Sequence, residues 1–340
     1  MLSTNVHSER VDSIKLDLNK IYSHCLDGNI KPALEIITSA DPDKLSEEDR
    51  NFKVRFESRF SKGTDESDYL KSKESAISDL IKIFHAYWRK SLLDNSQNYD
   101  DELISNLAVF LRSDKNEDSV KEALNKYLSA LGLHTAGFGK TGRFYDLLVW
   151  SSQTDTVYTI LLHKEEIKVN VNFMENFITL GWEEYATLCR YYPGGWTTTE
   201  SLFCVKSAYD LNSEVFKISY LAHEGRHFSD YKIFPKLKSA DLEYRAKLTE
   251  LSLANESLYR TINFFINNAN YDGNNGHSIA NYCVVRDLSR KIFKVEFEKD
   301  IKKWELIKAE IINKAAYDIF TENTKILKKA GPDVEKYIKN

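Results

Sequence analysis

His223-Glu224-Gly225-Arg226-His227 is an HExxH segment, and it lies in a stretch of sequence that otherwise has the pattern of an α-helix. Two histidines four residues apart on a helix lie on one face, one turn apart, so that both imidazoles can bind the same metal ion. Glu224 cannot easily join them as a ligand, but its carboxylate can reach a water molecule bound to that ion. We therefore predict a metal-bearing helix, with His223 and His227 as ligands and Glu224 as the general base.

The residues that flank the segment support a helix. Apolar residues at helical spacing, among them Val215 and Ile218, precede the segment. Asn212 or Ser213 can cap the start of this helix, and Pro235 closes it. Because HExxH fixes only three positions, the alternative is a buried helix whose histidines merely find hydrogen-bond partners.

Two residues inside the motif are less typical of a metal-binding helix. Gly225 costs the helix about 1 kcal/mol relative to alanine, and it could allow another backbone to approach closely. Arg226 is charged where many such motifs have a neutral residue, and we expect its side chain to point outward to solvent.

The sequence after His227 limits the choice of a third ligand, since a catalytic zinc ion usually has three protein ligands and one open position. Metzincins carry HExxHxxGxxH, but Asp230 and Ile233 occupy the positions of the glycine and the third histidine. The Gly-Thr-x-Asp-x-x-Tyr element of the Asp-type zincins is matched only in its last part, by Asp241–Tyr244, and the Gly-Thr is missing. The remaining option is a glutamate on a second helix.

Residues 239–251 are predicted to form this second helix. Glu243, Ala246 and Glu250 share one of its faces, and a small residue beside a ligand lets two helices approach closely. The stretch resembles the Glu-x-x-Ala element of the gluzincins, and this resemblance implies that Glu243 is the third ligand. Lys247 departs from the family pattern, because several gluzincins have at this position an Asp or Asn that supports a metal-bound histidine.

Two further carboxylates are candidates for the same site. Glu250 is the second choice for the third ligand, or it supports one imidazole from outside the ligand shell. Asp230 is another candidate for that supporting position. The alternative for Glu243 or Glu250 is a solvated charge on the helix surface, where glutamates usually lie.

By these motifs, roughly residues 140–285 resemble a gluzincin-type zinc metallopeptidase, without assignment to a specific peptidase family. The resemblance implies that the chain hydrolyses peptide bonds in a peptide or protein substrate. His223, His227 and Glu243 would hold one Zn²⁺, while Glu224 would take a proton from the bound water and pass it to the leaving amine. The alternative function is that of a non-catalytic or regulatory metal-binding interaction protein, which uses the zincin fold and a helical N-terminal domain as a scaffold.

Size and composition favour a two-domain cytoplasmic protein. The chain has 340 residues, 42% of them hydrophobic, and a formal net charge of −4, which gives no indication of nucleic acid as a partner. Its four cysteines are scattered and form no CxxC pair. The apolar runs are too short to span a membrane, and the N-terminus lacks the layout of a secretory signal, although unconventional export stays open. Nothing in the sequence indicates an oligomeric state.

We expect an α+β fold in which a helical N-terminal domain, residues 1–132, precedes a zincin-like metallopeptidase domain, residues 133–340. The second domain is predicted to contain a small mixed sheet within residues 140–210. The metal-bearing helices follow in residues 212–256, and helices fill residues 257–340. The N-terminal domain is expected to serve in docking or regulation, or as structural support.

The local pattern predicts the elements of both domains. Helices in the N-terminal domain are expected within residues 11–25, around residues 33–37 after Gly28, and within residues 69–93 and 120–131. Four strands are expected at residues 143–150, 156–162, 166–172 and 200–206, with turns at 151–155 and 193–196 and a helix at 173–190. The last strand is expected to have a free edge that could pair with an extended peptide.

Asn267 to Gly276 is predicted to be a polar loop that continues to Asn281, with a helix beginning near Tyr282. His277 and Asn281 carry donors that could stabilise an oxyanion or contact the substrate from across the cleft. The alternative for His277 is a solvent-exposed loop histidine.

Overall fold

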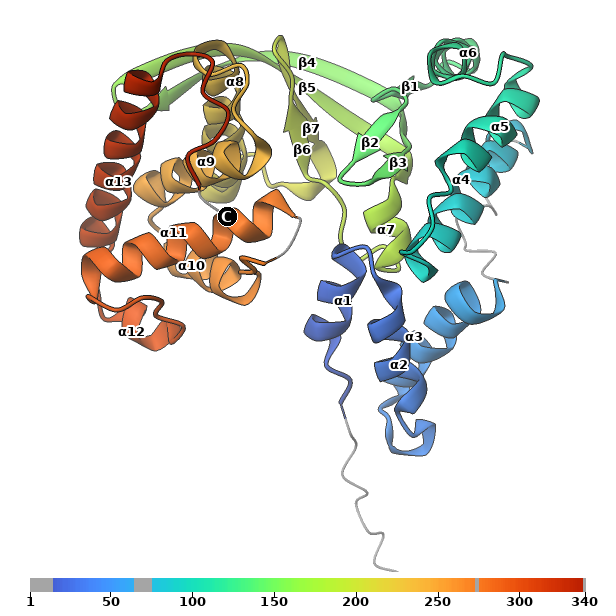
Figure 1. The fold of residues 1–340 in the computed structure, drawn as a ribbon, viewed down its shortest axis with the longest axis horizontal. Coiled ribbons are helices and arrows are strands. Elements are labelled where there is room, and N and C mark those ends of the chain that lie inside the picture. Colours follow the sequence, from blue (N-terminus) through green and yellow to red (C-terminus); the bar gives the residue numbers. More distant parts are fainter. Residues whose placement is uncertain (1–14, 64–74, 273–274, 339–340) are drawn as a thin grey trace, which may run out of the picture. The chain divides into compact units, whose positions relative to one another are not determined.

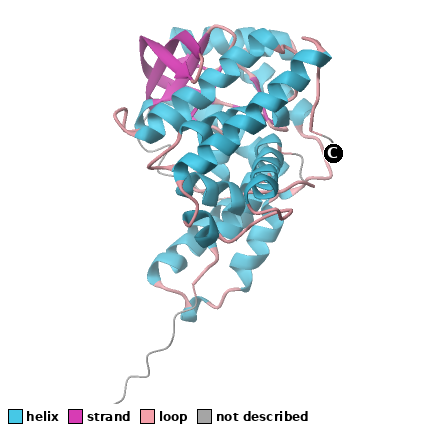
Figure 2. Cartoon of the chain, turned by 90° about the vertical axis from the view of Figure 1, so that its left-hand side faces the viewer, coloured by secondary structure: helices cyan, strands magenta, loops and turns pink. Residues whose placement is uncertain are grey.

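The computed structural model describes residues 15–63, 75–272 and 275–338 (Figure 1). Helices predominate, and the strands are fewer (Figure 2). The chain is therefore α+β, as predicted. None of the helices in the described part of the chain carries an apolar stretch long enough to cross a bilayer.

The chain divides into two compact units, each made of two segments. Unit 1 consists of Met1–Trp150 and Phe177–Tyr192, and unit 2 consists of Ser151–Asn176 and Pro193–Asn340. The predicted boundary at residue 133 differs from this division, because residues 133–150 and 177–192 group with the N-terminal helices. Two long strands, described below, contribute residues to both units.

Unit 1 is built mainly of helices around an aromatic core. Its helices are α1 (Leu18–Leu26), α2 (Ile30–Ser39), η1 (Pro42–Lys44), α3 (Glu47–Glu57), η2 (Ser58–Lys62), α4 (Ser75–Leu93), α5 (Asp100–Leu111), α6 (Glu117–Ala130) and α7 (Trp182–Ala186). The four predicted helices correspond to α1, α2, α4 and α6, although residues 11–14 and 69–74 lie outside the described residues. The indole nitrogen of Trp88, which is 1% exposed, donates to the carbonyl oxygen of Tyr145 at 2.8 Å and so satisfies a polar group within this core.

The strands form one mixed sheet and one small hairpin. The strands are β1 (His134–Thr135), β2 (Gly139–Thr141), β3 (Phe144–Asp146), β4 (Leu148–Leu162), β5 (Glu165–Leu180), β6 (Gly195–Thr197) and β7 (Ser201–Val205). The order in the larger sheet is β1-β4-β5-β7-β6, while β2 pairs with β3. β5 and β7 are parallel, and β6 runs antiparallel to β7.

Three local predictions about this sheet were wrong. Residues 151–155 are not a turn but the middle of β4, and residues 173–190 are not one helix, because β5 continues to Leu180 before α7 begins. Residues 193–196 are not only a turn, since Gly195 begins β6. The extended conformation of residues 173–174 is stabilised by pairing with β7, opposite Cys204 and Val205, a contact that the local pattern does not contain.

The predicted free edge also lies elsewhere. β7 was expected to offer an unpaired edge, but it is paired on both sides, with β5 and with β6. The outer strand beside β7 is therefore β6. The ring of Trp196 on β6 stacks on Phe203 of β7, with a centroid separation of 5.3 Å.

Gly181, between β5 and α7, has a backbone conformation that favours glycine, with φ of 92° and ψ of −167°. A Cβ atom there would lie 2.3 Å from Oδ1 of Asp146, the atom that accepts hydrogen bonds from the Leu147 and Trp182 N–H groups. Replacing Gly181 with alanine is expected to lower the free energy of unfolding by about 3 kcal/mol, measured by urea denaturation. The matched control is Gly142→Ala, where φ is 63° but nothing lies within 4 Å of the added Cβ, and we expect a loss of only about 1 kcal/mol. Equal losses would show that the contact with Asp146 is unimportant.

Unit 2 contains the HExxH segment and is organised around one central helix. Its helical elements are η4 (Lys206–Ala208), η5 (Val215–Ala222), α8 (His223–Ile233), α9 (Ser239–Leu253), α10 (Leu258–Asn267), α11 (Gly276–Ile292), α12 (Ile301–Glu305) and α13 (Ala309–Ala330). α9 packs against α8, α11 and α13 (Figure 1).

All residues of α9 from Asp241 to Ser252 are buried, although five of them carry charged side chains. These five are Asp241, Glu243, Arg245, Lys247 and Glu250. Burying a charge is costly unless it has a partner, so each of these side chains needs a partner on α9 itself or on a neighbouring element. One of these buried charges, Glu243, belongs to the candidate site.

Candidate metal centre

The helix that carries the HExxH motif has two parts. Residues Val215–Ala222 wind as a π-helix, and the α-helix α8 begins at His223. The predicted helix is therefore present, but its first half is π rather than α, a rare form that is frequent at functional sites. Ser213 caps the start as predicted, because its hydroxyl oxygen accepts from the Phe216 N–H at 3.1 Å. Since α8 begins at the first motif residue, His223 and His227 keep α-helical spacing.

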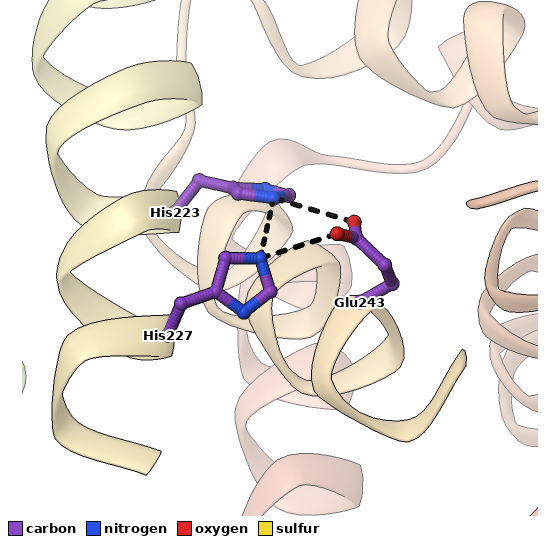
Figure 3. Close-up of side chains that lie close together, drawn as sticks. All are labelled: His223, His227 and Glu243. Carbon is purple, nitrogen blue, oxygen red and sulfur yellow. Dashed lines mark hydrogen bonds and ion pairs between the residues drawn. The ribbon is translucent and has the colours of Figure 1, made fainter. Parts of the chain in front are cut away.

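His223, His227 and Glu243 converge at one point, as Figure 3 shows. The two Nε2 atoms lie 3.2 Å apart, Nε2 of His223 lies 3.4 Å from Oε2 of Glu243, and Nε2 of His227 lies 3.3 Å from Oε1 of Glu243. The three residues are buried, with exposed fractions of 8%, 6% and 7%. Ligand atoms at bond lengths of 2.0–2.1 Å from a tetrahedral zinc ion are separated by about 3.3 Å. The donor types and their spacing therefore fit such an ion.

Two helices bring these ligand atoms together. His223 and His227 lie on α8, and Glu243 lies on α9, which packs against it. Ala246, one turn after Glu243, is completely buried, as expected for a small residue at a close helix contact. At Gly225 an added Cβ would lie 3.1 Å from Cδ1 of Ile160 on β4, so the close neighbour there is a side chain rather than the backbone that we expected.

Glu250 contacts His223 from the side opposite to Glu243. Its Oε2 lies 3.4 Å from Nδ1 of His223, whereas Glu243 and His227 approach Nε2. Burial by itself would lower the pKa of His223, but Glu243 and Glu250 raise it to about 10. Burial likewise raises the pKa of Glu250, but its contact with His223 brings the net value below the ordinary one. Glu250 is thus placed to support an imidazole rather than to complete the ligand set.

The carboxylate of Glu224 is bound by Thr197, a residue that the sequence did not indicate as part of the site. The hydroxyl of Thr197 lies 2.5 Å from Oε2 of Glu224 and donates to it. Thr197 is the last residue of β6, the strand that was predicted to be part of a turn, so the only signal in the sequence was a threonine run after Gly194-Gly195-Trp196. Glu224 is half-buried, whereas His223, His227 and Glu243 are buried.

His277, on α11, lies close to Glu243. This helix begins at Gly276, not near Tyr282 as predicted, so His277 lies in its first turn. Its Nδ1 is 2.9 Å from Oε2 of Glu243, while 63% of its side chain is exposed. Burial raises the pKa of Glu243, but the neighbouring His277 and His227 bring it well below the usual value.

Asn281 does not take the position that was predicted for it. It is 2% exposed, and its amide nitrogen donates to the carbonyl oxygen of Asn268 at 3.1 Å. The donor that was expected to stabilise an oxyanion is therefore used within the fold, because α11 already includes this residue and turns it toward the preceding loop.

Asp230 and Arg226 also differ from their predicted positions. Asp230 is completely buried, and its carboxylate accepts from Nε and Nη2 of Arg245 at 2.7 and 2.9 Å, so it does not support an imidazole. Arg226 is 3% exposed rather than solvated; it donates to Asp230 at 3.4 Å and to Glu165 at 2.6 Å. These pairs link α8 to α9 and to the start of β5, and they explain why a charged residue is accommodated inside the motif.

Lys247, which departs from the gluzincin sequence pattern, is buried next to Glu243. Its Nζ lies 3.6 Å from Oε2 of Glu243 and 4.8 Å from the ring centre of Phe265.

Comparisons of this chain with protein-family models, with curated proteins and with solved structures found no match. The chemistry of the site consequently rests on its own side chains. These are two imidazoles and a carboxylate whose ligand atoms surround one point, and a second carboxylate, Glu224, fixed beside them by Thr197.

Proposed function

We propose that this chain is a zinc-dependent peptidase of the gluzincin type and that unit 2 is its zincin-like catalytic domain. The observation that carries the proposal is the convergence of His223, His227 and Glu243, with Glu224 held separately at their side. A site that has three ligands and a free carboxylate differs from a closed structural zinc site, in which four protein ligands fill the coordination sphere.

The side chains divide the work of hydrolysis. His223, His227 and Glu243 would bind the zinc ion, and Glu250, 3.4 Å from Nδ1 of His223, would support its ring from the other side. When bound, zinc polarises the substrate carbonyl and makes a water molecule more acidic. Glu224 then removes the proton of the attacking water and later donates it to the leaving amine. Thr197 donates to Oε2 of Glu224 and so orients this carboxylate.

The substrate is a peptide in an extended conformation that binds along β6. This strand ends at Thr197, the residue that contacts Glu224, and it is the last strand in the order of the larger sheet. An outer strand offers N–H and C=O groups to an added strand, which brings a peptide bond toward the carboxylate of Glu224.

The metal site is tested by the zinc content of purified protein. We expect one zinc ion per chain in the wild type, and less than about a tenth of this in His223→Ala and His227→Ala, because each variant removes one of three ligands. His134→Ala is the control, since His134 is exposed and stacks on Trp150 in unit 1, and it should keep the full content. Inductively coupled plasma mass spectrometry gives the measurement. Equal metal in all four proteins would refute the ligand assignment.

The reaction is tested by exposing an unbiased peptide library to the zinc-loaded wild type. We expect cleavage products that disappear after chelation and return when zinc is restored. A protein that binds zinc but cleaves no peptide would instead favour the non-catalytic, metal-binding interaction protein as the function of this chain.

A further inference from the structure

Lys247 is a buried lysine beside the candidate metal centre. It lies on α9, one turn after Glu243 and one turn before Glu250, and only 5% of it is exposed. Lysines are almost never fully buried without a partner. Lys247 forms an ion pair with Oε2 of Glu243, at 3.6 Å.

Oε2 of Glu243 is a shared atom. Nδ1 of His277 lies 2.9 Å from it, Nε2 of His223 lies 3.4 Å from it, and Lys247 is the third group. A metal ion bound by Glu243 and the lysine ammonium would share one carboxylate, and two neighbouring cations repel each other strongly in a buried environment.

We propose that Lys247 is an internal counter-ion that competes with the metal for Glu243 and sets the metal affinity below the value that the three ligands alone would give. This inference rests on the proposed zinc site. In metal-free protein, the ammonium adds to the compensation of the buried Glu243 carboxylate, which His223 and His277 also contact. Lys247 is thus a positioning residue that lets the same fold exist with and without its ion.

The direction of the effect follows from both forms of the protein. Without Lys247, the metal-free form loses a charge that compensates Glu243, and it becomes less stable. The metal-bound form loses a repulsion between two cations, and it becomes more stable. Both changes favour binding, so removal of Lys247 must tighten the metal site. A lysine that only supported the ligand carboxylate would give the opposite result.

The test is the zinc dissociation constant of the full chain, measured by competition with a fluorescent chelator at fixed pH and ionic strength. We expect Lys247→Met and Lys247→Gln to bind zinc at least about tenfold more tightly than the wild type, while their metal-free forms melt at lower temperature. Lys247→Arg keeps the charge and should stay within about threefold of the wild type. Lys232→Met is the matched control, because Lys232 also lies over an aromatic ring, 3.7 Å from the centre of Phe228, and its removal should leave zinc affinity unchanged.

The possible outcomes separate the two proposals. Absence of zinc binding by the wild type would refute the metal site itself. Binding by the wild type, with equal or weaker binding by both neutral variants, would refute only the counter-ion role of Lys247. A neutral variant that unfolds without zinc and folds with it supports that role. Neutral variants that remain unfolded even with zinc contradict it, because Lys247 would then be needed for the fold alone.

Discussion

Replacing Glu224 with glutamine is expected to lower kcat for peptide hydrolysis by about a thousandfold while the protein keeps its zinc. Glutamine preserves the size of the side chain and can still accept the Thr197 hydrogen bond, but its amide cannot take a proton from water. The measurement combines steady-state kinetics on a peptide found in the library with the zinc content of the same preparation. Loss of zinc in this variant would place Glu224 among the ligands instead.

Thr197→Val gives the matched control for this variant. It leaves the carboxylate of Glu224 in place but removes the hydroxyl that holds Oε2 at 2.5 Å. We expect a fall in kcat of about tenfold, because the base is less well oriented but is still present. Turnover of Glu224→Gln equal to that of the wild type would exclude Glu224 as the base, whatever Thr197→Val shows.

Replacing Asp230 with alanine is expected to lower the free energy of unfolding by about 3–5 kcal/mol, because it leaves Arg245 buried without its carboxylate partner. Arg245 is 1% exposed, so its charge has no access to solvent. It makes two hydrogen bonds to Asp230. Urea denaturation followed by circular dichroism gives the measurement. The double variant Asp230→Ala with Arg245→Met should recover part of the loss, since both charges are then absent.

An exposed pair provides the control for this prediction. Lys314 and Asp318 on α13 form an ion pair at 3.0 Å, in which 76% of the lysine side chain is exposed. Lys314→Ala should change the free energy of unfolding by less than about 0.5 kcal/mol. If Asp230→Ala were equally mild, water would have to reach the buried pair, and the ionic link between α8 and α9 would contribute little to stability.

The convergence of the candidate site was predictable because it depends on helical periodicity. His223 and His227 are one turn apart on α8, and Glu243 faces them across a helix contact that the small Ala246 permits. The helical period places Glu243 and Glu250 on one face, and the resemblance to the gluzincin Glu-x-x-Ala element favoured Glu243 of the two. The structure does bring Glu243 to the two histidines, and it turns Glu250 toward the other ring nitrogen of His223.

The errors occurred where partners distant in the sequence decide the conformation. β5 extends through residues that were predicted to form a helix, because part of it pairs with β7, about thirty residues further along the chain. Arg226 can be buried because Glu165, the first residue of β5, accepts a hydrogen bond from it at 2.6 Å. Thr197 was missed because β6 has only three residues, too few for an alternating pattern to indicate a strand.

Because of the buried charges of α9, we expect unit 2 to unfold as a whole rather than helix by helix. If one neighbouring helix separated from α9, buried charges on α9 would lose their partners. Separation of α8, for example, would take Asp230 away from Arg245. We therefore expect the separation of α8, α11 or α13 from α9 to be coupled to unfolding of the helices that pack around α9. The amide protons of α9 should exchange with deuterium only through complete unfolding of this unit, and they should be among the slowest in the chain.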